Sequence, residues 1–126
     1  MPKTALILFA HGSRDPDWAA PLKRVRAAVL AASPTLKIDL AFLEFLSPSL
    51  QECAAAMVSE GYDRIVVVPM FIAQGGHLKN DLPLIVDELR TRFPQVAFDM
   101  PGPVGEADSV VQAMAAHVLG LSVAGH

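Results

Sequence analysis

Hydrophobic positions along the chain fall into four short apolar runs, separated by longer segments in which apolar residues recur every three or four positions. The runs are Thr4 to Ala10, Lys37 to Leu43, Arg64 to Met70 and Gln95 to Met100. The third run is rich in β-branched residues, which favour strands. Because the runs do not alternate apolar with polar positions, they are typical of strands buried on both faces, as in a parallel sheet.

The segments between the runs have the periodicity of amphipathic helices. Their apolar faces consist of Trp18, Leu22, Val25 and Val29; Leu50, Cys53, Ala54, Met57 and Val58; Leu82, Ile85, Val86 and Leu89; and Val110, Val111, Met114 and Val118. We expect Ser47 to cap the second helix, with Pro48 at its first position and Gly61 at its end. Pro83 should lie near the first turn of the third helix, and the tail 120–126 should be frayed.

The predicted order is therefore βαβαβαβα. Alternation at this spacing predicts an α/β fold, a four-stranded parallel sheet with right-handed crossovers and helices on both faces. A length of 126 residues fits a single domain, so we expect residues 1–126 to form one domain without linker or internal repeat.

Composition narrows the function classes. Ten Lys and Arg against thirteen Asp and Glu give a net charge of −3, which argues against a nucleic-acid partner because that would need a basic face. The one cysteine, Cys53, excludes a disulfide framework and a CxxC zinc site. No apolar run is long enough to span a membrane or to serve as a signal peptide, so we expect a cytoplasmic protein with no membrane partner.

Candidate chemistry lies at the ends of the predicted strands. His11 directly follows the first run, Glu44 the second, and His77 lies in the loop expected over residues 71–81. In parallel α/β sheets, ligands bind at the carboxyl ends of the strands, so these three side chains should meet at one edge. Two imidazoles and a carboxylate suit cobalt, nickel, iron(II) or zinc, and three protein ligands leave coordination positions free. The same groups can exchange protons near neutral pH.

Residues beside the two histidines also suit a ligand. Gly12, Gly75 and Gly76 permit close backbone approach and positive φ angles. Arg14 and Lys79 suit the carboxylates of a substrate. Each of these residues has a structural alternative: the glycines could serve turns alone, and the two cations could be solvated.

Several apolar residues stand at or beyond the strand ends. They could cover a flat ligand or a partner subunit, or belong to the core; they are Phe45, Leu46, Phe71 and Ile72. Cys53 lies on an apolar helix face and is interpreted as a packing residue. His117 is interpreted as a structural or surface residue.

Several short motifs follow one another over most of the chain. They are LFAHGSR at 8–14, AFLE at 41–44 with PSL at 48–50, Gly61, VVVPMFI at 66–72, GGHLKNDLP at 75–83, and GPVGE at 102–106. In this order and at this spacing they resemble the class II tetrapyrrole chelatases, and among them the short CbiX-type sirohydrochlorin chelatases.

The resemblance implies a lyase-class enzyme that inserts a divalent metal into a reduced tetrapyrrole, in cobalamin, siroheme or nickel-macrocycle biosynthesis. Cobalt is the metal expected first, with nickel and iron as alternatives. The metal is a substrate, and no organic cofactor is implied. By match to the motifs, His11 and His77 bind metal and handle protons, with Glu44 as a further ligand. The expected macrocycle contacts are Arg14, Phe71, Gly75, Gly76 and Lys79.

The resemblance also implies a homodimer. Longer family members have two similar lobes with a cleft between them, whereas this sequence has one lobe. The short form rebuilds the cleft by pairing two copies. The chain lacks the histidine-rich stretch that some relatives carry.

Two other functions stay open at this point. One is a metal- or tetrapyrrole-binding module without catalysis, because one lobe offers half a cleft. The other is phosphoryl transfer with His11 as nucleophile, although Ala10 stands where an arginine should precede that histidine. The residues leave open which metal is inserted, which pathway uses the product, whether a dimer holds one macrocycle or two, and which group accepts the pyrrole protons.

Overall fold

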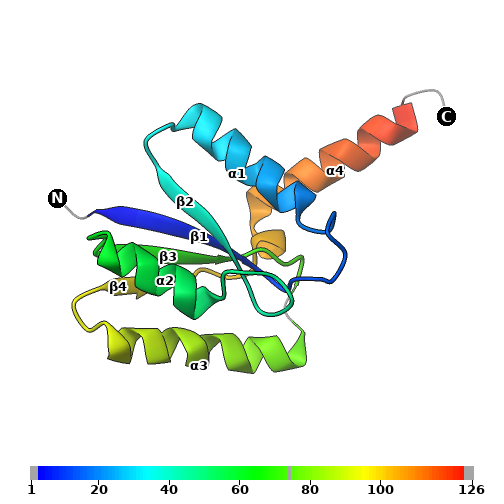
Figure 1. Cartoon of the computed structure of the whole chain (residues 1–126). Helices are drawn as coiled ribbons and strands as arrows, with labels where there is room; N and C mark the ends of the chain where they lie inside the picture. Colours follow the sequence, from blue (N-terminus) through cyan, green and yellow to red (C-terminus); the bar gives the residue numbers. More distant parts are fainter. Residues whose placement is uncertain (1–2, 74, 124–126) are drawn as a thin grey trace.

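The elements follow one another in the predicted alternation. The computed structural model describes residues 3–73 and 75–123, without the side chains of His77 and Val123. In chain order the elements are β1 (Thr4–Ala10), α1 (Ala20–Ala32), β2 (Lys37–Phe42), α2 (Leu50–Ser59), β3 (Arg64–Pro69), α3 (Gly76–Arg92), β4 (Ala97–Asp99), the 3-10 helix η1 (Val104–Glu106) and α4 (Asp108–Val123) (Figure 1). The predicted α/β class is confirmed.

The four strands form one parallel sheet in the order β2-β1-β3-β4. The central strand is β1, where Leu8 pairs with Leu40 of β2 and Val68 of β3. In this register Ala10, Phe42 and Pro69 end their strands close together. The carboxyl ends of β1, β2 and β3 therefore meet at one edge, as the sequence predicted.

The two faces of the sheet are covered unequally. Toward α2 and α3, the side chains of Ala5, Ile7 and Phe9 from β1 are almost fully buried, as are Ile65 and Val67 from β3. They form the main core with the apolar stripes of the two helices. This face is more completely shielded from solvent than the other, because two helices pack on it.

The opposite face is covered by α1, which lies over the β2 side of the sheet (Figure 1). No residue of α1 is fully buried, and Leu22 and Val29 are half-buried. Ala19, just before the helix, packs with Ala10 and Phe42 in a small second cluster. The core on this side is thin.

Helix α2 begins two residues later than predicted. Its N-cap is Ser49, whose hydroxyl accepts a hydrogen bond from the Glu52 amide (3.1 Å), while the Glu52 carboxylate accepts one from the Ser49 amide (2.9 Å). This reciprocal capping box needs an acid three residues after the cap, which Ser49 has and Ser47 lacks. The prediction of Ser47 as the cap was wrong. Gly61 directly follows the C-cap at φ +93°, as predicted.

Helix α3 is longer at its start than predicted. It begins at Gly76, so His77 and Lys79 lie on a helix and not in a loop. Pro83 stands inside the helix and not near its first turn. Buried Leu78 extends the stripe that continues at Leu82, and this burial stabilises the extra turn despite the lost amide of Pro83.

Helix α4 differs from the prediction both in where it ends and in how much of it is buried. It continues to Val123, so residues 120–123 of the tail expected to be frayed are helical, and 124–126 lie outside the described residues. The side chains from Val111 to Ser122 are all exposed, including the predicted core positions Val111, Met114 and Val118. No helix in the described part of the chain combines the length and apolar character needed to cross a bilayer.

The capping box predicts a difference between two nearby serines. Ser49→Ala should lower the free energy of unfolding by about 1 kcal/mol, because it leaves the Glu52 amide without its acceptor. Ser47→Ala is the matched control and should change stability by less than about 0.5 kcal/mol. Urea unfolding followed by circular dichroism measures both. Equal losses for the two variants would contradict the assignment of the cap.

Candidate active site

A hollow of about 270 Å³ lies at the carboxyl edge of the sheet. Its described lining residues are His11, Leu43, Gly75, Gly76, Leu78 and Asp81. They come from the loops that follow β1 and β2 and from the start of α3. The hollow therefore lies where the sequence placed the candidate chemistry.

Backbone contacts hold the His11 loop against the Glu44 loop. The Leu43 amide donates to the Ala10 carbonyl (2.9 Å), and the Glu44 amide donates to the His11 carbonyl (3.0 Å). Gly12 has φ +96°, and a side chain there would collide with the Glu44 carbonyl. Both its conformation and its surroundings therefore require glycine, as the sequence predicted for close approach.

The imidazole of His11 packs against the ring of Phe71, with the two ring centroids 4.7 Å apart and the planes tilted by 53°. Phe71 meets Phe9 of the core edge-on, at 6.2 Å and 85°. The Phe71 carbonyl accepts a hydrogen bond from the Gly105 amide of η1 (2.9 Å). Only 6% of Phe71 is exposed, so this residue belongs to the core. Its ring is the surface against which the imidazole packs.

The segment that carries His77 borders the same hollow. His77 lies in the first turn of α3, between the lining residues Gly76 and Leu78, and its side chain lies outside the described part of the structure. Asp81 follows one helical turn later and lines the hollow too. The sequence analysis missed Asp81. Its spacing of four residues from His77 places the two residues on one helix face only if the helix already includes both, and the helix was expected to begin near Leu82.

Among the side chains that the structure describes, no three His, Cys, Asp or Glu residues lie close enough to hold a metal ion. Glu44 is joined to His11 through the backbone, but it is not among the described residues that line the hollow. The grouping of His11, Glu44 and His77 around one metal therefore stays a prediction.

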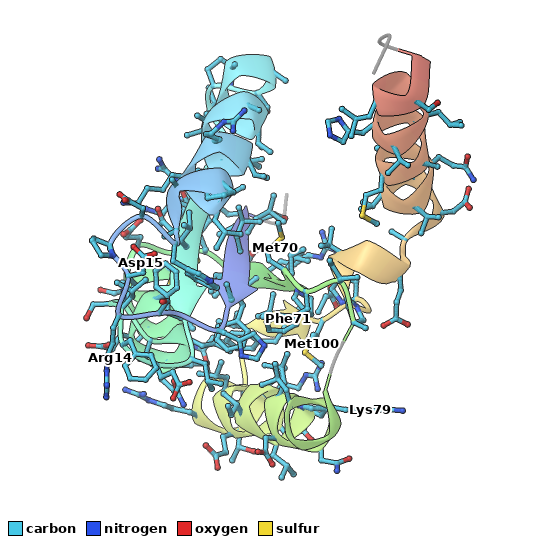
Figure 2. All side chains as sticks on the ribbon, turned by 90° about the vertical axis from the view of Figure 1, so that its right-hand side faces the viewer. Arg14, Asp15, Met70, Phe71, Lys79 and Met100 are labelled. Atoms are coloured by element: carbon cyan, nitrogen blue, oxygen red, sulfur yellow. The ribbon has the colours of Figure 1, made fainter. Side chains whose placement is uncertain are left out.

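The segments that carry the lining residues also present apolar and basic side chains. The Arg14 guanidinium lies 4.7 Å from the centre of the Phe45 ring, which is 54% exposed. Leu43 and Ile72 are exposed as well. Figure 2 looks at this edge and shows Arg14 and Lys79 on opposite sides of Phe71, with Lys79 pointing outward. The two predicted cations thus flank the site and do not meet in it.

The glycine pair before His77 adopts a different conformation from the one expected. Gly75 is the N-cap of α3 with φ −72°, and Gly76 is the first helical residue, so neither uses a positive φ. A side chain at either position would meet no atom within 4 Å. Their effect is to leave the amino end of α3, with its free amides, accessible from the hollow.

A larger hollow at the β2 edge contains none of the candidate histidines. Its lining includes Arg26, Asp39 and Cys53. Burial raises the pKa of the Cys53 thiol to about 11. Cys53 is buried and belongs to the main core, which confirms its interpretation as a packing residue. The raised pKa also disfavours the thiolate that a nucleophile needs.

Comparisons with known proteins agree on one family. The CbiX family model matches residues 5–120. A sirohydrochlorin cobaltochelatase of Saccharolobus solfataricus is 27% identical over 119 residues, which cover 90% of this chain and 91% of the relative. With other curated relatives the match covers 55% or 35% of a longer chain.

Solved structures give the same result. A CbiX protein from Marinobacter aquaeolei VT8, described as one of cobalamin (vitamin B12) biosynthesis, superposes with a TM-score of 0.82 at 26% identity, covering 93% of this chain and 95% of that one. The sirohydrochlorin chelatase SirB from Bacillus subtilis, in complex with cobalt, gives 0.72 at 25% identity. The match covers 94% of this chain and 50% of SirB, so this chain spans half the length of that chelatase.

The close contact at Gly12 predicts a large effect of a single methyl group. Gly12→Ala should lower the free energy of unfolding by about 3 kcal/mol or more, because positive φ and the collision with Glu44 add together. Gly61→Ala is the matched control: it has a similar φ of +93° but open surroundings, and should cost about 1–2 kcal/mol. Urea unfolding compares them. The contact would be disproved by a Gly12→Ala loss no larger than that of Gly61→Ala.

The raised pKa of Cys53 predicts slow alkylation. At pH 8 a thiol with a pKa of about 11 is roughly one-thousandth thiolate, against about a quarter for an exposed cysteine. Iodoacetamide should therefore modify the folded protein at least ~100-fold more slowly than the chain in urea. Mass spectrometry follows the reaction. Comparable rates in the two states would show that the thiol is accessible and ionised.

Proposed function

The chain belongs to the CbiX family, and we propose that it is a sirohydrochlorin chelatase that inserts a divalent metal into this reduced tetrapyrrole. The observation that carries the proposal is the hollow bordered by both histidine-bearing segments at the carboxyl edge of the sheet. The relatives named above support the substrate, and SirB structures with cobalt and with Fe³⁺ support a metal as co-substrate. Cobalt is the metal we propose first, with nickel and iron(II) as alternatives.

We propose that His11 and His77 hold the incoming metal, with Glu44 as a carboxylate ligand. Imidazoles bind cobalt, nickel and iron(II) readily, and a small ligand set leaves positions for the nitrogens of the macrocycle. The Phe71 ring beneath His11 restricts the tilt of the imidazole. The Gly12 contact keeps the Glu44 loop next to His11. Asp81 lines the same hollow and supplies a second carboxylate beside the metal.

Insertion must release two protons from the macrocycle for each divalent ion that enters. Imidazoles take up protons near neutral pH, so His11 and His77 suit this task once the metal moves from them to the pyrrole nitrogens. Asp81 and Glu44 stabilise the positive charge that a protonated imidazole then carries. The protein lowers the barrier by holding metal and ring in position and by replacing water around the ion.

The surroundings of the hollow suit a flat ligand with carboxylates at its rim. Leu43, Phe45 and Ile72 offer exposed apolar surface to the ring. Arg14 and Lys79 stand on opposite sides, where they can each pair with a carboxylate of a broad macrocycle. The amides at the start of α3 add further donors near Gly75 and Gly76.

We propose that the active form is a homodimer. This chain matches half of SirB, and its hollow opens at one edge of a single sheet. A second copy facing that edge would supply the other wall of a cleft that encloses the macrocycle. The tetrapyrrole and the second copy are the partners that we propose.

The central test is an anaerobic insertion assay with sirohydrochlorin. Cobalt, nickel and iron(II) are added in turn, and the absorption spectrum of the macrocycle is followed. His11→Ala and His77→Ala should each lower the catalysed rate by about 100-fold or more, because each removes a metal ligand and a proton acceptor. His126→Ala is the matched control, which removes an imidazole from the last residue of the chain, and should keep the wild-type rate.

Two results would overturn the proposal. Insertion no faster than the uncatalysed background with any of the three metals would indicate a binding module without catalysis. A wild-type rate in His77→Ala would remove this residue from the mechanism. Circular dichroism of each variant confirms that the fold is retained.

A further inference from the structure

The loop between β2 and α2 is a short projection that is held at both of its ends. The Phe42 amide donates a hydrogen bond to the Pro48 carbonyl (2.9 Å), so the chain leaves the sheet and returns to it at nearly the same place. On the way out, the Glu44 amide is bonded to the His11 carbonyl of the neighbouring loop (3.0 Å). Phe45 lies at the tip of this projection.

The backbone makes an unusually tight turn at the tip. The Leu46 amide donates a hydrogen bond to the Glu44 carbonyl (2.9 Å), and Phe45 between them has φ +68°. A hydrogen bond between residues two apart, with positive φ at the middle residue, defines the rare and strained form of the γ-turn. In the described part of the chain, Phe45 is the only residue other than glycine with a positive φ. A bulky side chain is disfavoured at this φ, whereas glycine would adopt it freely.

The packing of the chain does not explain why this residue is a phenylalanine. The side chain of Phe45 is 54% exposed, and it belongs to neither apolar cluster of the described residues. Its neighbour Leu46 packs against the small second cluster, so the loop is anchored without the aromatic ring. Strained backbone at an exposed residue is typical of functional sites. The ring therefore points to a role outside the folding of this chain.

The Phe45 ring has one charged neighbour, Arg14. The guanidinium of Arg14 lies over the ring, 4.7 Å from its centre, and none of the ion pairs between described side chains involves Arg14. A guanidinium that stacks on an aromatic face still presents N–H donors at its own edge. Figure 2 shows Arg14 at the carboxyl edge of the sheet, to one side of Phe71. We call Phe45 and Arg14 the tip pair.

We propose that the tip pair is one recognition unit for the macrocycle, in which the Phe45 ring contacts the flat face and the stacked Arg14 meets a carboxylate at the rim. Aromatic rings pack well on a flat π system, and a guanidinium pairs with carboxylates in a fixed geometry. Phe45 then determines specificity for a ligand that is both flat and acidic, and it also holds Arg14 in position. The inference rests on the proposed function, because it names the same macrocycle.

The first test is equilibrium binding of metal-free sirohydrochlorin, followed anaerobically by the absorption of the macrocycle. Phe45→Ala should raise the dissociation constant about 10-fold, because the stacking surface is lost. Phe45→Tyr keeps an aromatic face and should bind within about 2-fold of wild type. Arg92→Gln is the matched control: that guanidinium lies over the Phe93 ring (4.9 Å) at the other end of α3, and its loss should leave binding unchanged. Wild-type affinity in Phe45→Ala would overturn the proposal.

A double-mutant cycle tests whether the two residues act as one unit. Arg14→Gln alone should raise the dissociation constant about 5-fold, but by less than about 2-fold in a Phe45→Ala background, because the guanidinium there has already lost its support. Effects that simply multiply would show two independent contacts and would overturn the recognition unit.

The strain at the tip has a stability signature of its own. Phe45→Gly and Phe45→Ala both remove the ring, so both should lose the same affinity for the macrocycle. Phe45→Gly should nevertheless unfold about 3–5 °C above Phe45→Ala, because glycine relieves the positive φ. At an ordinary negative φ, alanine would be the more stable of the two. Thermal unfolding followed by circular dichroism measures the difference, and a less stable glycine variant would contradict the strained turn.

The insertion assay on the same variants keeps the two proposals apart. Phe45→Ala should raise KM for the macrocycle about 10-fold with a smaller effect on kcat, because the ring acts in binding. Binding of sirohydrochlorin by wild type without metal insertion would contradict the proposed function and leave the tip pair standing. Normal insertion with an unchanged KM in Phe45→Ala would overturn the tip pair alone. Failure of wild type to bind sirohydrochlorin at all would overturn both.

Discussion

The backbone contact between Gly12 and Glu44 fixes the geometry of the carboxyl edge. Strand pairing brings the ends of β1 and β2 together, and the hydrogen bond from the Glu44 amide to the His11 carbonyl continues this pairing beyond the sheet. A side chain at position 12 would separate the two loops, because it would collide with the Glu44 carbonyl. The contact therefore keeps the loop that carries His11 beside the loop that carries Glu44.

The second constraint is the unequal covering of the two faces. The face under α2 and α3 holds the buried core, and Phe71 extends that core to the floor of the site. The other face has one helix that buries none of its residues completely. The face under α2 and α3 therefore positions the chemistry of the site. Through its bond to Phe71, η1 links the start of α4 to the residue that supports His11.

The sequence predicted β1, β2 and β3 well, because each is a short apolar run, although β3 is fully buried on one face only. The fourth strand covers three residues of the six that were predicted. The sequence also placed His11 and Glu44 at one edge, since parallel strands end together. The prediction failed where two local signals compete. Both Ser47 and Ser49 are suitable N-cap residues, but only Ser49 is followed three residues later by an acid, Glu52, that completes a capping box. Gly75 and Gly76 suggested a loop, and Pro83 suggested that the helix begins close to it. These two signals hid the first turns of α3 and with them Asp81. The sequence did not predict the exposure of α4, because its apolar positions have the spacing of a packed helix whereas its side chains from Val111 to Ser122 are exposed.

The most direct test of the account is to locate a bound metal. Crystals of the protein with Co²⁺ would give an anomalous signal at the cobalt absorption edge. We predict one strong site per chain, with the imidazoles of His11 and His77 of the same chain both within bonding distance of about 2.1 Å. Cobalt bound by only one of these histidines, or by neither, would contradict the claim that the carboxyl edge of this sheet is the metal-inserting site.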